Sequence, residues 1–292
     1  LQQIEQDDDG SIRIGAAVCL DRFVDDPLTD QFPSAIQIIQ GISSLQLQSQ
    51  GTLVGELLRR PNCWYFREGH GLLADSSRMV NEGDNRYHAI LGNRGPARVV
   101  NASRLAPALI TLGARVRIAG PAQDQEQFLE LADLYRTPTV DSEHENVLQP
   151  GQLVTHVIIP AHGNRLSAAY EIRHGEGPDQ PLAAAAVSME VVSGRVQHAS
   201  IVLGQVAPTP WTAAAAAQSR HGQAVTEDSA TNAGMKAVAD AMPLSQNEYK
   251  IQLAQVAVKR AVLKAAGLDT GGLDGPLLNE PAASPSLETH LA

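Results

Sequence analysis

The chain has 292 residues, of which 43% are hydrophobic and only 4% aromatic, so it can bury the cores of two modest domains built mainly from aliphatic side chains. Its net charge of −10 argues against nucleic acid or an anionic membrane surface as a main partner. Two cysteines, Cys19 and Cys63, exclude a disulfide framework and an all-cysteine zinc site. No apolar run reaches the roughly 18 residues of a membrane span, so we expect no such span. The two cysteines could form one disulfide, but we expect two reduced thiols in a cytoplasmic protein.

The beginning of the chain predicts a strand, a helix and a surface segment, in that order. In residues 10–20, β-branched side chains bounded by glycine predict the strand. Residues 32–44 predict the helix, because Pro33 and Ser34 suit a helix start and the isoleucines that follow recur at helical spacing. The polar stretch 67–85 is rich in turn formers and has no periodicity, so we expect it to run over the surface.

The middle of the chain predicts two further helices and two further strands. Residues 105–120 read as a short helix, a stop at Gly113 and a strand. The stretch "DQEQFLELADLYRTPT", residues 124–139, predicts an amphipathic helix that Pro138 ends. Residues 152–160 alternate apolar and polar side chains and predict a strand.

The pattern changes after residue 160. Residues 181–211 contain two strand-like runs around Ser193 and Gly194, which suit a hairpin turn, and residues 167–174 predict a third strand. Alanine-rich helical sequence follows, and residues 247–267 predict a long amphipathic helix. We therefore expect an α+β protein of two domains, residues 1–160 and 161–267, followed by a flexible tail over residues 268–292.

Standard catalytic motifs are missing from the sequence. It contains no GxxxxGK, GxSxG or HExxH motif. The sequence therefore lacks the residues that usually carry out nucleotide hydrolysis, serine hydrolysis and zinc peptidase chemistry. The loosely spaced histidines His156, His162 and His174 have no carboxylates at ligand spacing, and they are interpreted as solvated or core-edge residues. We predict no catalytic residue and no metal site.

The stretch "GTLVGE" after residue 50 resembles a glycine loop that binds phosphate. Consecutive backbone N–H groups in such a loop can hold a pyrophosphate, and the Thr52 hydroxyl could add a donor while Gly55 supplies conformational freedom. Val54, however, would crowd an approaching phosphate. Glu56 would place a carboxylate beside the anion, and like charges repel.

Cys63 lies in an aromatic context, "NCWYF". Such surroundings indicate a buried thiol, and buried thiols are generally unreactive. A single cysteine also cannot hold an iron–sulfur cluster, which usually takes four thiolates. We therefore expect no iron–sulfur cluster in this chain.

Several segments in series resemble one family, the flavin-binding medium subunit of molybdenum hydroxylases such as xanthine dehydrogenase, carbon monoxide dehydrogenase and aldehyde oxidoreductases. "GTLVGELLRRPNCWYF" is similar to the second flavin loop and the RCWYF-like segment of the aldehyde oxidoreductase branch. "DNRYHAILG" and "SRLAPALITLGA" are similar to two further motifs of that branch. "VLGQVAPTPW" and "LSQNEYKIQLAQVAVKRAVL" resemble the family's C-terminal domain.

The resemblance implies a fold and a set of binding residues. It implies a PCMH-type FAD-binding subdomain, an antiparallel sheet with helices, followed by a domain like the C-terminal domain of the CO dehydrogenase flavoprotein, a three-stranded sheet on a helical bundle. FAD is the implied cofactor. The positions that the resemblance assigns to FAD are Thr52, Leu53, Val54, Gly55 and Ser103.

This sequence also departs from the family pattern. Val54 replaces the first glycine of the family's T-(I/L)-G-G-N loop and Glu56 its asparagine, while Arg104 stands at the aspartate of the PSD motif. Ile172 appears where the C-terminal domain often places a lysine near the flavin, and the family's first flavin subdomain, with its AGGTDL-like loop, would precede residue 1.

Two hypotheses follow for the function. In the first, the chain is the flavin-binding electron-transfer subunit of an oxidoreductase, with a molybdopterin-binding large subunit and a [2Fe-2S] small subunit as partners by resemblance. It would then bind and tune the flavin without a general acid or base of its own. In the alternative, the chain is a structural or docking subunit that keeps the fold and binds no flavin.

Overall fold

The computed structural model describes residues 1–122, 125–175, 177 and 179–271. The tail expected over residues 268–292 lies largely outside these residues. In the described part of the chain, no helix has both the length and the hydropathy needed to cross a bilayer.

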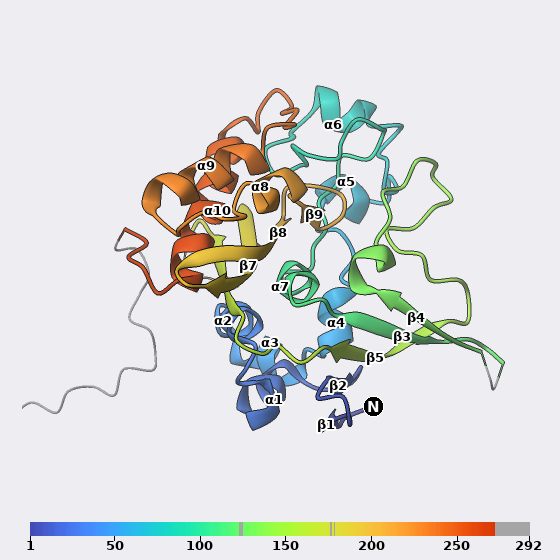
Figure 1. The fold of residues 1–292 in the computed structure, drawn as a ribbon. Helices are drawn as coiled ribbons and strands as arrows, with labels where there is room; N and C mark the ends of the chain where they lie inside the picture. The colour runs from blue at the N-terminus through green and yellow to red at the C-terminus, as the bar shows by residue number, and fades with distance from the viewer. Residues whose placement is uncertain (123–124, 176, 178, 272–292) are drawn as a thin grey trace, which may run out of the picture.

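The first half of the chain builds a five-stranded antiparallel sheet in the order β1-β2-β5-β3-β4. Its strands are β1 (Ile4–Gln6), β2 (Ile12–Gly15), β3 (Arg115–Ala119), β4 (Glu126–Glu130) and β5 (Leu153–Ile159). Strand β2 thus pairs with a strand about 140 residues later in the chain, which closes the first half into one unit (Figure 1).

Short helices lie between these strands in the chain. They are α1 (Leu20–Asp25), η1 (Pro27–Thr29), α2 (Pro33–Gln40), α3 (Leu45–Gln50), α4 (Leu53–Leu57), α5 (Trp64–Arg67), α6 (Arg78–Glu82), α7 (Ala106–Thr111) and η2 (Leu131–Leu134). The predicted helix after Pro33 is confirmed as α2, which buries Ile38 and Ile39. The predicted stop at Gly113 is also confirmed, since its φ of +76° is a left-handed conformation that glycine adopts readily.

The second half builds a four-stranded antiparallel sheet in the order β6-β7-β8-β9. Its strands are β6 (Leu166–Ile172), β7 (Ala183–Val192), β8 (Arg195–Gly204) and β9 (Trp211–Thr212). Ser193 and Gly194 have φ values of 50° and 75°, as a tight hairpin between β7 and β8 requires. The two-residue strand β9 extends the three-stranded sheet that the resemblance implied.

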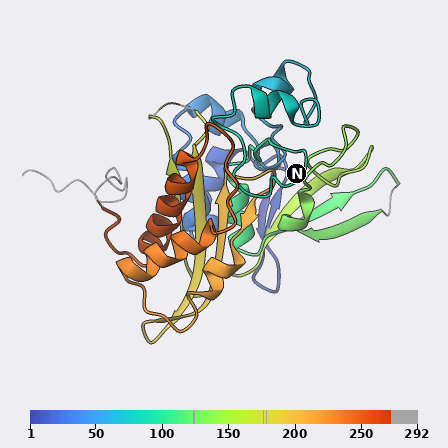
Figure 2. The same ribbon diagram turned by 90° about the horizontal axis from the view of Figure 1, so that it is seen from above.

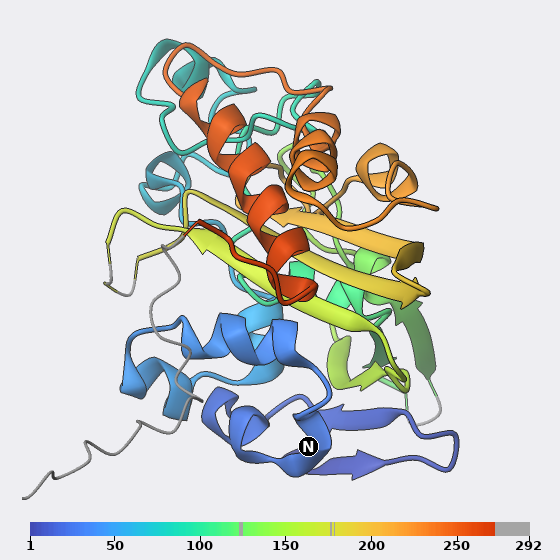
Figure 3. The same cartoon turned by 60° about the vertical axis from the view of Figure 1, so that its left-hand side comes forward.

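Helices cover both faces of this second sheet. On one face lie α8 (Ala214–Gln218), α9 (Glu227–Ala237) and α10 (Tyr249–Ala265), and Figure 3 shows α10 lying along β6 and β7. Helices α2 and α7 of the first half pack on the other face (Figure 2). Residues 183–189 are accordingly buried without alternation, since neither face of β7 meets solvent. The expected α+β class is confirmed.

The amphipathic helix predicted over residues 124–139 is wrong. Within the described residues of that segment, Glu126–Glu130 form strand β4 and Leu131–Leu134 form a single 3₁₀ turn. Leu131 and Leu134 are fully buried, and their three-residue spacing suits a 3₁₀ turn as well as an α-helix. Pairing with β3 decides the conformation of the residues before them.

Candidate functional site

The glycine loop folds as the start of a helix. Thr52 is the N-cap of α4, and its hydroxyl accepts a hydrogen bond from the N–H of Gly55 at 3.1 Å. Leu53 is fully buried and Val54 is 8% exposed, whereas Gly55 is exposed. The predicted residues Leu53 and Val54 thus face the core, while Thr52 and Gly55 lie at the surface.

The N–H groups of this helix start all have partners within the protein. Leu53 N donates to the Val18 carbonyl at 2.8 Å, and Val54 N donates to the Ala16 carbonyl at 3.3 Å. Gly55 N and Glu56 N both donate to Thr52, to its hydroxyl and its carbonyl respectively. The loop therefore does not present the row of free N–H groups with which a glycine loop usually holds a phosphate.

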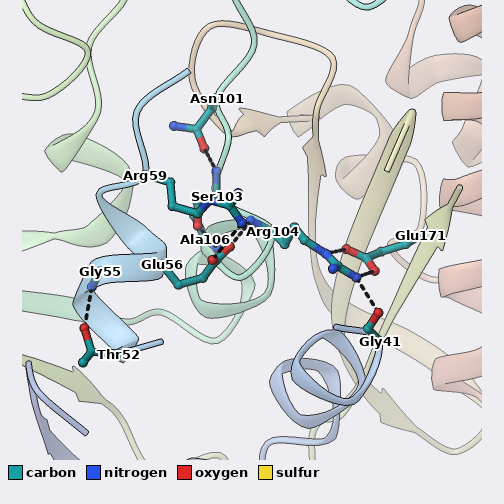
Figure 4. Close-up of polar contacts among 10 residues, drawn as sticks. All are labelled: Gly41, Thr52, Gly55, Glu56, Arg59, Asn101, Ser103, Arg104, Ala106 and Glu171. Atoms are coloured by element: carbon teal, nitrogen blue, oxygen red, sulfur yellow. Dashed lines mark hydrogen bonds and ion pairs between the residues drawn. The ribbon is translucent and has the colours of Figure 1, made fainter. Parts of the chain in front are cut away.

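Ser103 stabilises the start of another helix. Its hydroxyl accepts a hydrogen bond from Ala106 N, the first residue of α7, at 3.0 Å, and its own N–H donates to the Asn101 carboxamide at 3.1 Å. Ser103 is 1% exposed. Its polar groups are used inside the protein, which gives the side chain a structural role at the turn into α7 (Figure 4).

Glu56 turns away from solvent and joins α4 to the segment before α7. Its carboxylate accepts a hydrogen bond from the backbone N–H of Arg104 at 2.9 Å and pairs with Arg59 at 3.2 Å. Burial raises the pKa of Glu56, and the charge of Arg59 and the hydrogen bond from Arg104 oppose that rise. The sequence had suggested a surface carboxylate facing an anion. The structure instead gives it an internal partner.

Arg104 is also buried, and its guanidinium reaches the second half of the chain. Its Nε donates to the carboxylate of Glu171 in β6 at 2.8 Å, and its Nη2 donates to the other oxygen of the same carboxylate. Nη2 also donates to the carbonyl of Gly41, at the end of α2, at 2.9 Å. Figure 4 shows these side chains meeting between α4, α2 and β6. Sequence analysis missed Arg59 and Glu171, and it singled out the neighbouring Ile172 instead.

A separate cavity of about 350 Å³ lies beside this group of side chains. Its lining includes Cys63, Trp64, His88, Gln205 and Lys250. The Cys63 sulfur lies 3.2 Å from Nε2 of His88, and burial raises the pKa of the thiol. Burial and the charge of Lys250 lower the pKa of His88 to about 4. This pair is therefore uncharged near neutral pH, as the interpretation of Cys63 as an unreactive thiol requires.

Lys250 fixes the wall of that cavity. Its amine is 1% exposed, and it donates to the carbonyls of Tyr87, His88 and Gln205 at 3.2, 3.2 and 2.6 Å. Gln205 has a φ of +63°, a conformation that costs free energy in a residue other than glycine. Across the described residues, no three His, Cys, Asp or Glu side chains gather as metal ligands would.

Comparison with known families decides the assignment of the chain. Residues 1–162, more than half of the chain, match the family described as the FAD binding domain in molybdopterin dehydrogenase. The chain belongs to this family. Residues 168–265 match the CO dehydrogenase flavoprotein C-terminal domain. The resemblance seen in the sequence is thereby confirmed, and the chain is a medium, FAD-binding type of subunit of the molybdenum hydroxylase family.

Individual relatives agree with this assignment. The aldehyde oxidoreductase FAD-binding subunit PaoB of Escherichia coli K12 is 28% identical over 265 residues, which cover 87% of this chain and 78% of that protein. The carbon monoxide dehydrogenase medium chain of Afipia carboxidovorans is 29% identical over 199 residues, 66% of each chain. Both relatives are subunits of larger enzymes.

The fold agrees with solved structures of the same kind. Quinoline 2-oxidoreductase from Pseudomonas putida 86 superposes with a TM-score of 0.66 at 21% identity, covering 91% of this chain and 78% of that chain. At this level of identity the similarity concerns the fold alone.

FAD is the cofactor in the family's name, and the start of α4 offers its pyrophosphate few contacts. The N–H groups that would hold a pyrophosphate are already used, and Glu56 and Arg104 bond to protein groups. Thr52 keeps a donor, because a hydroxyl that accepts one hydrogen bond can still donate its proton. The loop thus offers a phosphate one hydroxyl and the exposed Gly55, and these residues alone do not make a pyrophosphate site.

Proposed function

We propose that this chain is the flavin-carrying, electron-transfer subunit of a molybdenum hydroxylase-like oxidoreductase. The observation that supports this proposal most is the match of residues 1–162 to a family of FAD-binding domains. When bound, a flavin would pass electrons between the partner subunits and an acceptor. The partners proposed are a molybdopterin-binding large subunit and a [2Fe-2S] small subunit, and the location proposed is the cytoplasm, where free thiols such as Cys19 and Cys63 persist.

Within this proposal, Thr52 and Gly55 contact the FAD. The buried residues Leu53, Val54 and Ser103 support these two residues from the interior of the protein. Thr52 has a hydroxyl proton to donate to a phosphate oxygen, and Gly55 has no side chain to obstruct the ligand. Other segments, contributed by the same polypeptide or by a partner subunit, supply the remaining phosphate contacts, since the N–H groups of α4 are used internally.

Co-expression tests the assignment. When this chain is produced together with its proposed large and small partner subunits, we expect the three to elute as one complex. The complex should show flavin absorbance near about 450 nm and close to one FAD per copy of this chain. Elution of this chain apart from both partners, at every salt concentration tried, would contradict the proposal.

Substitution of Thr52 tests the site. Thr52→Ala removes the proposed phosphate contact and the helix cap together, and we expect roughly tenfold weaker FAD binding and a loss of about 1 kcal/mol in the free energy of unfolding. Thr52→Ser should restore both. Ser44→Ala, which removes the cap of α3 in the same way, should cost stability but leave FAD binding unchanged. Equal FAD affinity for wild type and Thr52→Ala would exclude Thr52 from the site.

One observation favours the alternative, a subunit of the same fold without flavin. The charged residues at two family ligand positions, Glu56 and Arg104, are satisfied within the protein, and so are the N–H groups of α4. A chain in this role would join the same partner subunits and stay colourless in their complex. The flavin absorbance of the complex distinguishes the two functions.

A further inference from the structure

Three charged side chains are buried together where the two halves of the chain meet. Glu56, Arg104 and Glu171 have exposed side-chain fractions of 7%, 1% and 7%. Charged groups are rarely buried to this extent unless they are paired, because each loses its hydration. Their partners therefore determine whether this cluster stabilises the molecule.

Arg104 makes its contacts across the junction. It precedes α7 in the first half, whereas Glu171 lies in β6 of the second, 67 residues away. The guanidinium binds both oxygens of that carboxylate, which is the strong bidentate geometry of arginine and carboxylate. The Gly41 carbonyl takes a further donor from Nη2. A side chain at residue 41 would crowd this arrangement, since a Cβ there would lie 3.2 Å from the Glu171 carboxylate and 3.3 Å from Nη2.

Glu56 holds the other end of Arg104. It accepts the backbone N–H of Arg104 and so fixes the position from which the arginine side chain starts. Arg59, two residues after the end of α4, pairs with Glu56 at 3.2 Å. Arg59 also reaches the second half, where the amide oxygen of Gln180, when turned toward it, accepts from its terminal nitrogens at 2.8 Å. Arg173 adds a third guanidinium at the junction, because its Nη1 donates to the same Gly41 carbonyl as Arg104.

Both ends of Arg104 are bound within the protein. Its backbone N–H donates to the Glu56 carboxylate, and its guanidinium donates to the Glu171 carboxylate. Burial alone would lower the pKa of Arg104, but its hydrogen bonds to Glu171 and the charges of both carboxylates outweigh burial and raise that pKa. The arginine is therefore charged in the folded protein.

We infer that Glu56, Arg104 and Glu171 form an internal clamp, which joins the two halves of the chain through hydrogen bonds and an ion pair within the protein. Ligand contacts are then left to Thr52 and Gly55 and to segments outside α4. Pairing of the two halves does not depend on flavin. The inference rests on the proposed function only for the identity of the ligand.

A double-mutant cycle on the full chain, without FAD, tests the clamp. We expect Arg104→Met to lower the folding equilibrium constant about 100-fold or more, since it leaves the Glu171 carboxylate buried without its cation. Glu171→Gln should be similarly damaging alone, yet it should cost less than about threefold when added to Arg104→Met. Urea unfolding followed by circular dichroism gives these constants. The clamp would be overturned if the losses of the two single variants multiplied in the double variant. It would also be overturned if the folding constants of the single variants lay within threefold of wild type.

The pair Arg117 and Glu126 provides the matched control. It joins β3 to β4 within the first sheet, and its side chains are 29% and 44% exposed. The same substitutions there should each change the folding constant less than about fivefold, as is usual for exposed pairs. If Arg104→Met does not fold, Arg104→Lys and Glu171→Asp take its place. Each keeps the charge but loses the bidentate geometry, and each should cost about tenfold.

Repeating the cycle with FAD separates this inference from the proposed function. At saturating FAD, the coupling between Arg104 and Glu171 should be unchanged. A coupling that disappears when FAD binds would show that the cofactor displaces Arg104, and the clamp would then be wrong as a ligand-independent device. A chain that binds no FAD even in the complex with its proposed partner subunits would refute the flavin-carrying role while leaving the coupling intact.

Discussion

Glu56 illustrates how one side chain changes what a helix start can do. With a neutral amide at this position, the start of α4 could face an anion. With a carboxylate, the side chain turns inward, accepts the N–H of Arg104 and pairs with Arg59. The sequence showed that the position was unusual. It could not show the direction of the side chain, because its partner Arg104 lies 48 residues away.

The stability contributed by Glu56 should depend on pH. Burial raises its pKa in the folded protein above the unfolded value, so its contribution is complete below the unfolded pKa and is lost as the pH rises through the folded pKa. Glu56→Gln does not titrate. The stability of wild type relative to this variant should therefore fall as the pH is raised from about 4 to about 7.

Urea midpoints over this pH range measure the difference, and Glu126→Gln is the control. The hydrogen bond from Arg117 lowers the pKa of Glu126, so its contribution is present above the unfolded pKa and is lost as the pH falls through the folded pKa. The two variants should therefore show slopes of opposite sign. A pH-independent difference for Glu56→Gln would contradict the account.

At the scale of elements, hydrophobic periodicity could not decide between helix and strand in the segment before Pro138. Phe128, Leu131 and Leu134 recur at intervals of three residues, which fits one face of a helix. In the structure, Phe128 is 45% exposed on β4, because pairing with β3 takes the backbone of Glu126–Glu130. The hairpin at Ser193 and Gly194 was predictable, since two adjacent residues carry its entire signal.

Lys250, near the start of α10, bonds this helix to other segments. Its amine donates to the carbonyls of Tyr87, His88 and Gln205, so Lys250→Met removes three hydrogen bonds. Among the described residues, only the His88 carbonyl then keeps another partner, Asn247. We expect a loss of about 3 kcal/mol or more in the free energy of unfolding. Lys259→Met, on the same helix but in an exposed pair with Glu227, should change it by less than about 1 kcal/mol. Equal, small effects in urea unfolding would show that the three bonds contribute little.

At the scale of the whole molecule, the second sheet is the common support of both halves. Helices α2 and α7 cover one face and α10 the other, so the first half completes the core of the second. Sequence motifs predicted the folds of both halves, because core patterns persist when surface residues change. They could not predict how the halves join. At that junction α2 and α7 pack on the second sheet and Arg104 binds Glu171, and these partners lie far apart in the sequence.

Titration of the purified chain with FAD tests the central claim most directly, that this chain is a flavin-carrying subunit. Equilibrium dialysis with absorbance near about 450 nm gives the bound flavin per chain, alone and in the complex with the proposed partner subunits. The account predicts a complex that approaches one FAD per copy of this chain, with roughly tenfold weaker FAD binding for Thr52→Ala and unchanged FAD binding for Ser44→Ala. A complex that assembles fully and remains colourless at saturating FAD would contradict it.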